Sequence, residues 1–324
     1  MNIVNTAKLI KHRYLDKKTL EHDVHEYLDQ YASSELSKQT GKSAARDILV
    51  YCHVVEKGLS HRKIKPLFGL DRVSLIAKAL QEYLDAGGKD DFIIGMALST
   101  LKKYNSVNRD LGVSEDKLVK IPDVASDVSL DVGVDDISES DYFSASEKSF
   151  SDVCKARHSI RLYDYKSEPI SIDEIMNCIN TAQNCPSACN RQSIRIKITT
   201  KEKTIEDICK IQGGSKGFGE NSGAIVLVTS DLSLYEPSER RMPMLDCGLF
   251  IMNFVYALYE KKIGSCILNG SFTLERENEM RKLVPIPENE VYAAVIAISK
   301  MPEGEYVKIA HSVKRKTEDI VTII

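Results

Sequence analysis

The sequence lacks a strong net charge, a long hydrophobic run and a recognisable leader segment. Its 324 residues include 44 Lys and Arg against 47 Asp and Glu, a net charge of −3 that does not favour nucleic acid or an anionic membrane as the main partner. The longest apolar run, 247–259, is interrupted by Gly248 and Asn253 and is shorter than the roughly 20 residues that span a bilayer. The N-terminus has no apolar core followed by a small-residue cleavage site, so we expect a cytoplasmic protein without a signal peptide.

Motifs for metals, phosphate loops and serine hydrolases are also missing. The eight cysteines include no C-x-x-C pair, and Cys185 and Cys189 have no histidine cluster near them, so we expect free thiols and no metal site. Neither G-x-x-x-x-G-K-[ST] nor G-x-S-x-G occurs. The glycines of Gly217–Gly223 nearly match a dinucleotide fingerprint, but the third comes one residue late and the loop precedes a strand. We interpret 213–221 as a mobile loop, either a simple turn or a flap whose Lys216 reaches a ligand.

Residues 1–120 read as a small all-α domain. Spaced apolar residues predict helices at 20–31, 44–58, 72–84 and 89–104, with Asp71 as the cap of the third. No combination of side chains in this region indicates chemistry.

The composition changes in the next segment, residues 121–147. Pro122 to Glu147 contains eight acidic residues and no Lys or Arg, and Pro122 and Gly133 argue against a continuous helix. We interpret it as a partly extended acidic linker between two domains.

Residues 148–324 alternate helices and strands. The polar alternation of several strands favours a mixed or antiparallel sheet flanked by helices, an α+β domain. The expected strands are 193–200, 224–229, 263–270 and 291–299, and the expected helices are 147–156, 202–211, 247–261 and 273–283. Asp246 is the predicted cap of the long apolar helix, which we expect to be buried or at a subunit interface.

The domain is organised around Ala156–Gln192, where two polar clusters flank a helix. The clusters are Arg157-His-Ser-Ile-Arg161 and Pro186-Ser-Ala-Cys-Asn-Arg-Gln192. Ser171 and Glu174 have the spacing of a capping box for the helix between them. Arginine offers a fixed fork of donors to phosphate, and Asn and Gln both donate and accept, so the pair of clusters suits a phosphorylated polyol with a polar ring.

R-x-S-x-R, a capped helix and then P-S-x-x-N-x-Q resemble the nitroreductase family of FMN-dependent oxidoreductases. The resemblance covers about 150–324 and implies a homodimer with FMN at the subunit interface, reduced by NADH or NADPH. It implies that Ser187 and Asn190 come from the second subunit and that the backbone at Asn269 and Gly270 lies beside flavin N5. The residues that it assigns to cofactor binding are Arg157, His158, Ser159, Arg161, Pro186, Ser187, Ala188, Asn190, Asn269, Gly270 and Arg315.

The implied reaction is a ping-pong cycle in which hydride passes from NAD(P)H through flavin N5 to a small acceptor such as a nitroaromatic or a quinone. The flavin carries the chemistry, so no side chain is assigned as a catalyst, while Arg161 and Asn269 are candidates for tuning it. Asn269 stands where many members of the family have an acidic residue. Ala188 replaces a second hydroxyl and Val313 a lysine of some members, which leaves fewer phosphate contacts.

Two alternatives stay open at this stage. One is an FMN-dependent dehydrogenase of a peptide or sugar intermediate, with the helical region binding the substrate. The other is a non-enzymatic scaffold that retains the flavin fold and acts through residues 1–120.

Overall fold

The computed structural model describes residues 13–14, 17–18, 20–21, 24, 34–124, 126, 128–163, 169–301, 304 and 306–324. The chain forms two compact units, Met1–Asp135 with Ala310–Ile324, and Asp136–Ile309. We call them the helical unit and the sheet unit. Most of the helix expected at 20–31 lies outside the described residues.

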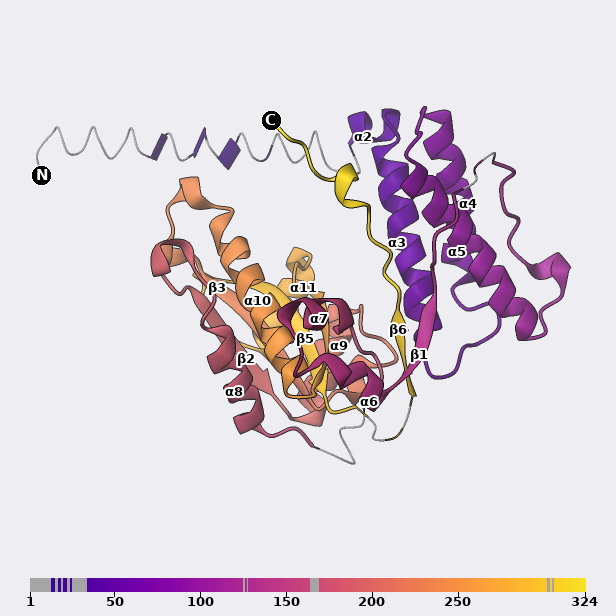
Figure 1. The fold of residues 1–324 in the computed structure, drawn as a ribbon. Coiled ribbons are helices and arrows are strands. Elements are labelled where there is room, and N and C mark those ends of the chain that lie inside the picture. Colours follow the sequence, from indigo (N-terminus) through magenta and orange to yellow (C-terminus); the bar gives the residue numbers. More distant parts are fainter. Residues whose placement is uncertain are drawn as a thin grey trace, which may run out of the picture. The chain divides into compact units, whose positions relative to one another are not determined.

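The helical unit is built on amphipathic helices that bury one face each. Its described helices are α2 (Glu35–Gln39), α3 (Lys42–Leu59), α4 (Leu70–Asp85) and α5 (Asp91–Asp110) (Figure 1). Ile48, Cys52 and Val55 recur at helical spacing on α3 and are almost completely buried. Three of the predicted helices are therefore present. The expected cap Asp71 is wrong, because α4 begins earlier and is preceded by Gly69 in the left-handed region, with φ of 59°.

The first part of the segment that we interpreted as a linker packs along α5. Asn105 of α5 donates at 2.8 Å to the carbonyl of Val119, just before this segment, and Ser99 of α5 accepts at 2.9 Å from the amide of Leu130, inside it. Val132 is buried in the core of the helical unit. The boundary between the units falls at Asp135, inside β1 (Val134–Ser138), a strand that the sequence did not predict.

The C-terminal tail returns to the helical unit, whereas the sequence interpretation assigned it to the second domain. The chain crosses back at the end of β6 (Tyr306–Ala310), which pairs with β1 in a two-stranded sheet. Beyond it, the amide of Ser312 donates to the buried carboxylate of Glu56 at 3.2 Å.

The sheet unit is organised around four antiparallel strands in the order β2-β3-β5-β4. They are β2 (Ile194–Thr199), β3 (Ala224–Asp231), β4 (Gly264–Asn269) and β5 (Glu290–Ser299). The antiparallel α+β fold expected from the sequence is confirmed.

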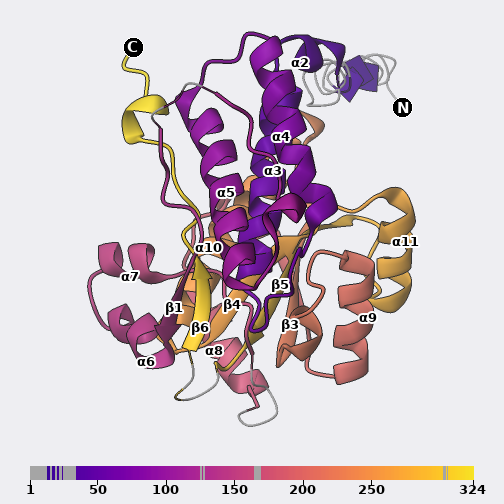
Figure 2. The same cartoon turned by 90° about the vertical axis from the view of Figure 1, so that its right-hand side faces the viewer.

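Helices cover both faces of this sheet. On one face, α8 (Ile172–Ala182) and α10 (Met242–Glu260) pack on alternate residues of β3 and β5 such as Val226 and Ile296. On the other, α9 (Glu202–Gln212) and α11 (Leu274–Leu283) lie side by side (Figure 2) and pack on Ile225 and Val295. Successive side chains of a strand point to opposite faces, so these two buried strands supply both cores.

The observed N-termini of the helices in the sheet unit test the capping predictions. Ser171 and Glu174 form the predicted capping box of α8, and Thr273 caps α11. The prediction for Asp246 is wrong: α10 begins at Met242, so Asp246 lies inside the helix and is buried. Two short helices precede these elements, α6 (Glu139–Tyr142) and α7 (Phe150–Ala156).

Among the described residues, α10 is the one helix whose length and mean hydropathy of 1.3 would allow a membrane span. Of its most apolar stretch, 56% is buried inside the protein. A helix buried to this extent is explained by its position over the sheet.

Candidate functional site

The first polar cluster follows α7, and hydrogen bonds to its backbone hold it in place. Arg157 ends the helix as its C-cap, with extended φ and ψ of −71° and 118°. The hydroxyl of Tyr142 donates to the carbonyl of His158 at 2.8 Å and accepts from the amide of His158 at 3.2 Å. The amide of Ile160 donates to the carbonyl of Ser265 at 2.9 Å, next to the start of β4. The segment is thus fixed between α6 and the sheet.

One side chain of this segment is buried in the core and the others are half-buried. Ile160 is completely buried, whereas Arg157, Ser159 and Arg161 are half-buried. The Nε atoms of both arginines are buried and have no hydrogen-bond partner within the described part of the chain. The guanidinium of Arg161 lies 6.0 Å from the centre of the Phe218 ring. Two cationic side chains on one short segment with buried, unsatisfied donors are suited to an anionic ligand.

The second polar cluster is a loop in an uncommon backbone conformation. Cys189, Asn190 and Gln192 have positive φ of 50°, 54° and 51°, although none is glycine. The amide of Gln192 donates to the hydroxyl of Ser187 at 3.0 Å. Non-glycine residues in this region cost conformational energy and persist where the surroundings hold them.

Arg191 holds one side of this loop, a role that the sequence interpretation missed. Its Nη1 and Nη2 atoms each donate to Glu239 at 2.7 Å, and Nη1 also donates to the carbonyl of Leu234 at 2.9 Å. The paired guanidinium lowers the pKa of Glu239 to about 2, which favours the ionised carboxylate at neutral pH. No spacing rule in the sequence joins residues so far apart.

Asp246 holds the other side. The amide of Ala188 donates to both carboxylate oxygens, at 3.1 and 3.0 Å, and the hydroxyl of Tyr235 donates to Oδ2 at 2.7 Å. Burial raises the pKa of Tyr235, so this hydroxyl remains a donor at neutral pH. Burial also raises the pKa of the neighbouring Cys247 thiol to about 12, and a thiol that stays protonated is a poor nucleophile.

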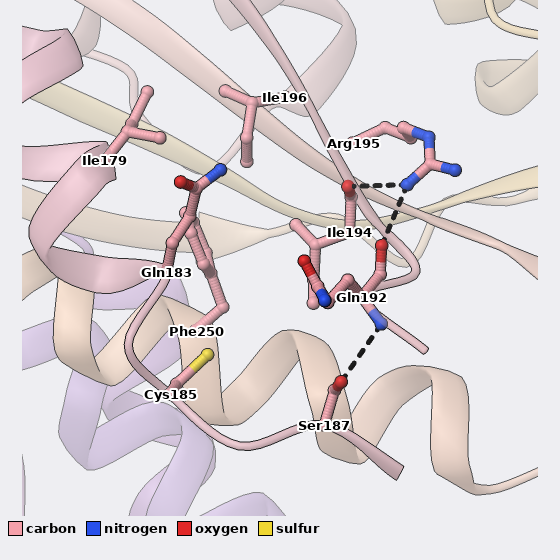
Figure 3. A pocket seen from close by; sticks show the side chains of 9 residues that line it. All are labelled: Ile179, Gln183, Cys185, Ser187, Gln192, Ile194, Arg195, Ile196 and Phe250. Carbon is pink, nitrogen blue, oxygen red and sulfur yellow. Dashed lines mark hydrogen bonds between the residues drawn. The ribbon is translucent and has the colours of Figure 1, made fainter. Parts of the chain in front are cut away.

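A cavity of about 220 Å³ opens beside the loop (Figure 3). Its apolar part comes from α8, β2 and α10, and its polar edge from the loop and the end of α8. The lining residues are Ile179, Gln183, Cys185, Ser187, Gln192, Ile194, Arg195, Ile196 and Phe250. In Figure 3, Arg195 is turned back onto backbone carbonyls, which leaves the amides of Gln183 and Gln192 and the hydroxyl of Ser187 as polar side-chain groups at the cavity.

The predicted turn after β4 has a tightly packed backbone. A Cβ atom on Gly270 would lie 2.5 Å from the amide nitrogen of Ala294 in β5, so no other residue fits without moving the strand. The side chain of Asn269 closes a local turn, accepting from the amide of Ser271 and donating to its carbonyl, both at 2.9 Å. Its own carbonyl accepts from Gln212 at 3.2 Å.

The glycine loop after α9 packs part of its residues against the sheet unit, and its expected mobility stays a prediction. Phe218 and Ser215 are buried, and Gly213 ends α9 with φ of 74°. Lys216 is exposed. Through Gln212 and Phe218, this loop contacts both the Asn269 turn and Arg161.

The predicted site residues fall into three groups. The Arg157–Arg161 segment, the glycine loop and the Asn269 turn form one neighbourhood, and Pro186, Ser187, Ala188 and Asn190 form a second around Asp246. Arg315 belongs to the helical unit, where its Nη1 donates to Asp90 at 2.7 Å and its guanidinium lies 4.5 Å from the Phe92 ring. Its role toward a phosphate stays a prediction. Among the described residues, no three His, Cys, Asp or Glu side chains gather as metal ligands.

Comparison with known families assigns the sheet unit. Residues 154–213 and 209–300 match, in two overlapping segments, the family model described as the nitroreductase family. This part of the chain is a nitroreductase domain. The match contains both polar clusters in full, beginning three residues before Arg157, and includes Gly270. No curated protein matches the chain.

Solved structures similar to the nitroreductase domain come from several bacteria. A nitroreductase-like protein from Streptococcus mutans is 17% identical over 54% of this chain and 98% of its own, with a TM-score of 0.47. A nitroreductase family protein from Streptococcus pneumoniae TIGR4 is 18% identical over 54% of this chain and 100% of its own, at 0.46. An FMN-dependent nitroreductase from Clostridium difficile R20291 is 14% identical over 52% and 92%, at 0.42.

Proposed function

We propose that this protein is an FMN-dependent oxidoreductase that takes electrons from NADH or NADPH and reduces a small acceptor such as a nitroaromatic or a quinone. The observation that carries the proposal is the pair of half-buried arginines on the R-x-S-x-R segment of a nitroreductase domain. Each has a buried Nε atom without a partner in the described part of the chain. A buried donor without a partner costs free energy. A bound phosphate would remove this cost by accepting hydrogen bonds from the donors.

The residues present fit an FMN cofactor. Arg157, Ser159 and Arg161 offer donors for the phosphate, the ribityl chain and the pyrimidine edge, and Ser187 and Asn190 offer a hydroxyl and an amide on a loop held in one conformation. The flavin, when bound, would supply the hydride transfer that no side chain of the domain can perform.

The protein's own residues then orient the cofactor and stabilise charge. Arg161, beside Phe218, places a permanent positive charge in a partly dehydrated position, where it acts more strongly than it would in water. Gly270 allows the turn after β4 to lie against β5, which fixes the backbone carbonyls and amides at that edge. The buried thiols of this domain, such as Cys178 with a pKa raised by burial to about 11, are unsuited to nucleophilic catalysis.

A second copy of the chain is the proposed partner. Leu245, Leu249 and Met252 repeat at helical spacing on α10 and are 52%, 37% and 37% exposed, while the opposite side of the helix packs on the sheet. An apolar stripe on an otherwise buried helix favours a subunit interface. We propose a homodimer through α10, in which the Ser187 loop of each copy contributes to the cofactor site of the other, and a cytoplasmic location.

The first test is an absorption spectrum of the purified protein with excess FMN, followed by NADPH or NADH under nitrogen. We expect a bound-flavin spectrum that bleaches with the nicotinamide and recovers when a quinone or nitroaromatic is added. Bound flavin that does not bleach would favour the dehydrogenase alternative. Absence of any flavin binding would refute the proposed function.

A further inference from the structure

Asp246 is a buried acidic residue that accepts hydrogen bonds from the backbone of the proposed cofactor loop. It is 1% exposed and lies within the first half of α10, where solvent cannot compensate its charge. Neither an Arg nor a Lys is recorded within ion-pair distance of it in the described part of the chain; its recorded partners are the amide of Ala188 and the hydroxyl of Tyr235. A buried carboxylate is costly unless such donors satisfy it, so the carboxylate favours the conformation in which Ala188 and Tyr235 both contact it.

The loop that Asp246 contacts would not hold its shape unaided. Its amide donor, Ala188, is followed at once by Cys189 and Asn190 in the left-handed region. The surroundings must supply the free energy that keeps two such residues there. The Ala188 amide lies at the start of this strained turn, so the bond to Asp246 fixes where the turn begins.

The hydrogen bonds around Asp246 continue into the core of the sheet unit. Tyr235 bonds to Ser193 as well as to Asp246, and Ser230 donates to Ser193 at 3.0 Å. Ser193 and Ser230 are both completely buried, at the ends of β2 and β3. The position of Asp246 is therefore set by the sheet, and through Asp246 the sheet sets the position of the loop.

We propose that Asp246, supported by Tyr235, is a positioning residue that holds the 187–192 loop in the conformation in which Ser187 and Asn190 contact the cofactor. This inference rests on the proposed FMN function for its functional consequence. The hold on the loop itself exists without the cofactor and can be measured in the free protein.

The geometry predicts which substitutions of Asp246 preserve its hydrogen bonds with Ala188 and Tyr235. In Asp246→Asn, the amide oxygen can accept from Ala188 while the amide nitrogen donates to the Tyr235 oxygen. The Tyr235 hydroxyl, which donates to Asp246 in the wild type, then turns to donate to Ser193. In Asp246→Ala, the amide of Ala188 and the hydroxyl of Tyr235 both lose their acceptor. The two variants therefore separate a positioning role from a need for negative charge.

The experiment measures three quantities in wild type, Asp246→Ala, Asp246→Asn and the control Met280→Ala. They are amide hydrogen exchange of 187–192 in the flavin-free protein, the dissociation constant for FMN, and the visible circular dichroism of bound FMN. Met280 is completely buried in α11 on the opposite face of the sheet, so its variant reports general destabilisation of the same unit. We expect Asp246→Ala to exchange the loop amides at least tenfold faster, to bind FMN at least tenfold more weakly and to change the dichroism.

Asp246→Asn should stay within threefold of wild type in both exchange and affinity. The inference is overturned if Asp246→Ala leaves loop exchange unchanged, or if Met280→Ala weakens FMN binding and alters the dichroism to the same degree. If the wild-type protein binds no FMN, the proposed function fails, while the exchange measurement still decides whether Asp246 holds the loop.

Discussion

The hydroxyl of Tyr142 offers a direct test of how the first polar cluster is held. Its oxygen donates to the carbonyl of His158 and accepts from the amide of the same residue, and the side chain is only 2% exposed. Tyr142→Phe keeps the ring and its edge contacts with Phe143 and Tyr259, at centroid distances of 4.8 and 5.2 Å. The substitution therefore removes two hydrogen bonds and little else.

The magnitude follows from those two bonds. At about 1 kcal/mol of net stability for each bond, the variant should lose roughly 2 kcal/mol. For a unit of this size, about 2–4 °C of melting temperature accompanies each kcal/mol, so we expect a decrease of roughly 4–8 °C. A loosened His158 backbone also releases Arg157 and Ser159, and a loss of about 1.4 kcal/mol there would weaken FMN binding tenfold.

The assay is differential scanning calorimetry together with FMN titration of Tyr142→Phe. Tyr306→Phe is the matched control, since Tyr306 is 66% exposed and the same atom is removed. If Tyr142→Phe melts within 1 °C of that control and binds FMN equally well, the reasoning that this hydroxyl holds the arginine segment is wrong.

Three further predictions concern other parts of the chain. Gly270→Ala should destabilise the sheet unit by about 1–3 kcal/mol in a melting experiment, because its Cβ would meet the backbone of β5 at 2.5 Å, and a melting temperature equal to that of wild type would refute this. Arg161→Ala should weaken FMN retention and slow flavin reduction by NADPH, and unchanged values in equilibrium dialysis and stopped-flow absorbance would contradict its assignment. For His311, burial lowers the pKa, but the carboxylate of Asp135, 3.0 Å from Nε2, and the neighbouring acceptors outweigh it and the pKa is raised. A raised folded-state pKa gives stability that is complete below the unfolded value of about 6.5 and is lost as pH rises through the folded value. Melting of wild type relative to His311→Asn should therefore show a benefit at pH 5.5 that is gone by pH 9, of at most about 1 kcal/mol because the carboxylate is largely exposed; a constant difference across this range would refute it.

Local sequence signals were sufficient where the interaction joins near neighbours. The capping box of Ser171 and Glu174 is present because both partners lie within one helical turn, and the strands appear where the sequence has either apolar–polar alternation, as in β2, or a short apolar run, as in β3 and β5. The R-x-S-x-R and P-S-x-x-N-x-Q clusters were found for the same reason, since each is a contiguous string. The family assignment of the domain followed from these strings and their order.

Predictions failed where a residue's partner is distant in sequence. Asp246 has the chemistry of a helix cap, yet Pro243 in the first turn allows α10 to start earlier, and the carboxylate then meets Ala188 across the fold. Arg191 read as part of a generic polar loop, and only the structure shows its paired bonds to Glu239.

The sequence alone thus determined the α+β class of the domain, the helical character of the region before it and the strings that suit a phosphorylated flavin, because short-range periodicity and residue chemistry encode these. It left open whether the sheet is mixed or antiparallel, which the strand pairing decided. Tertiary structure decided which buried groups hold those strings in place. It also decided that the first part of the acidic segment packs along α5 and that the tail with Arg315 belongs to the helical unit. Such contacts join residues up to hundreds of positions apart, and no local pattern specifies them until the chain has folded.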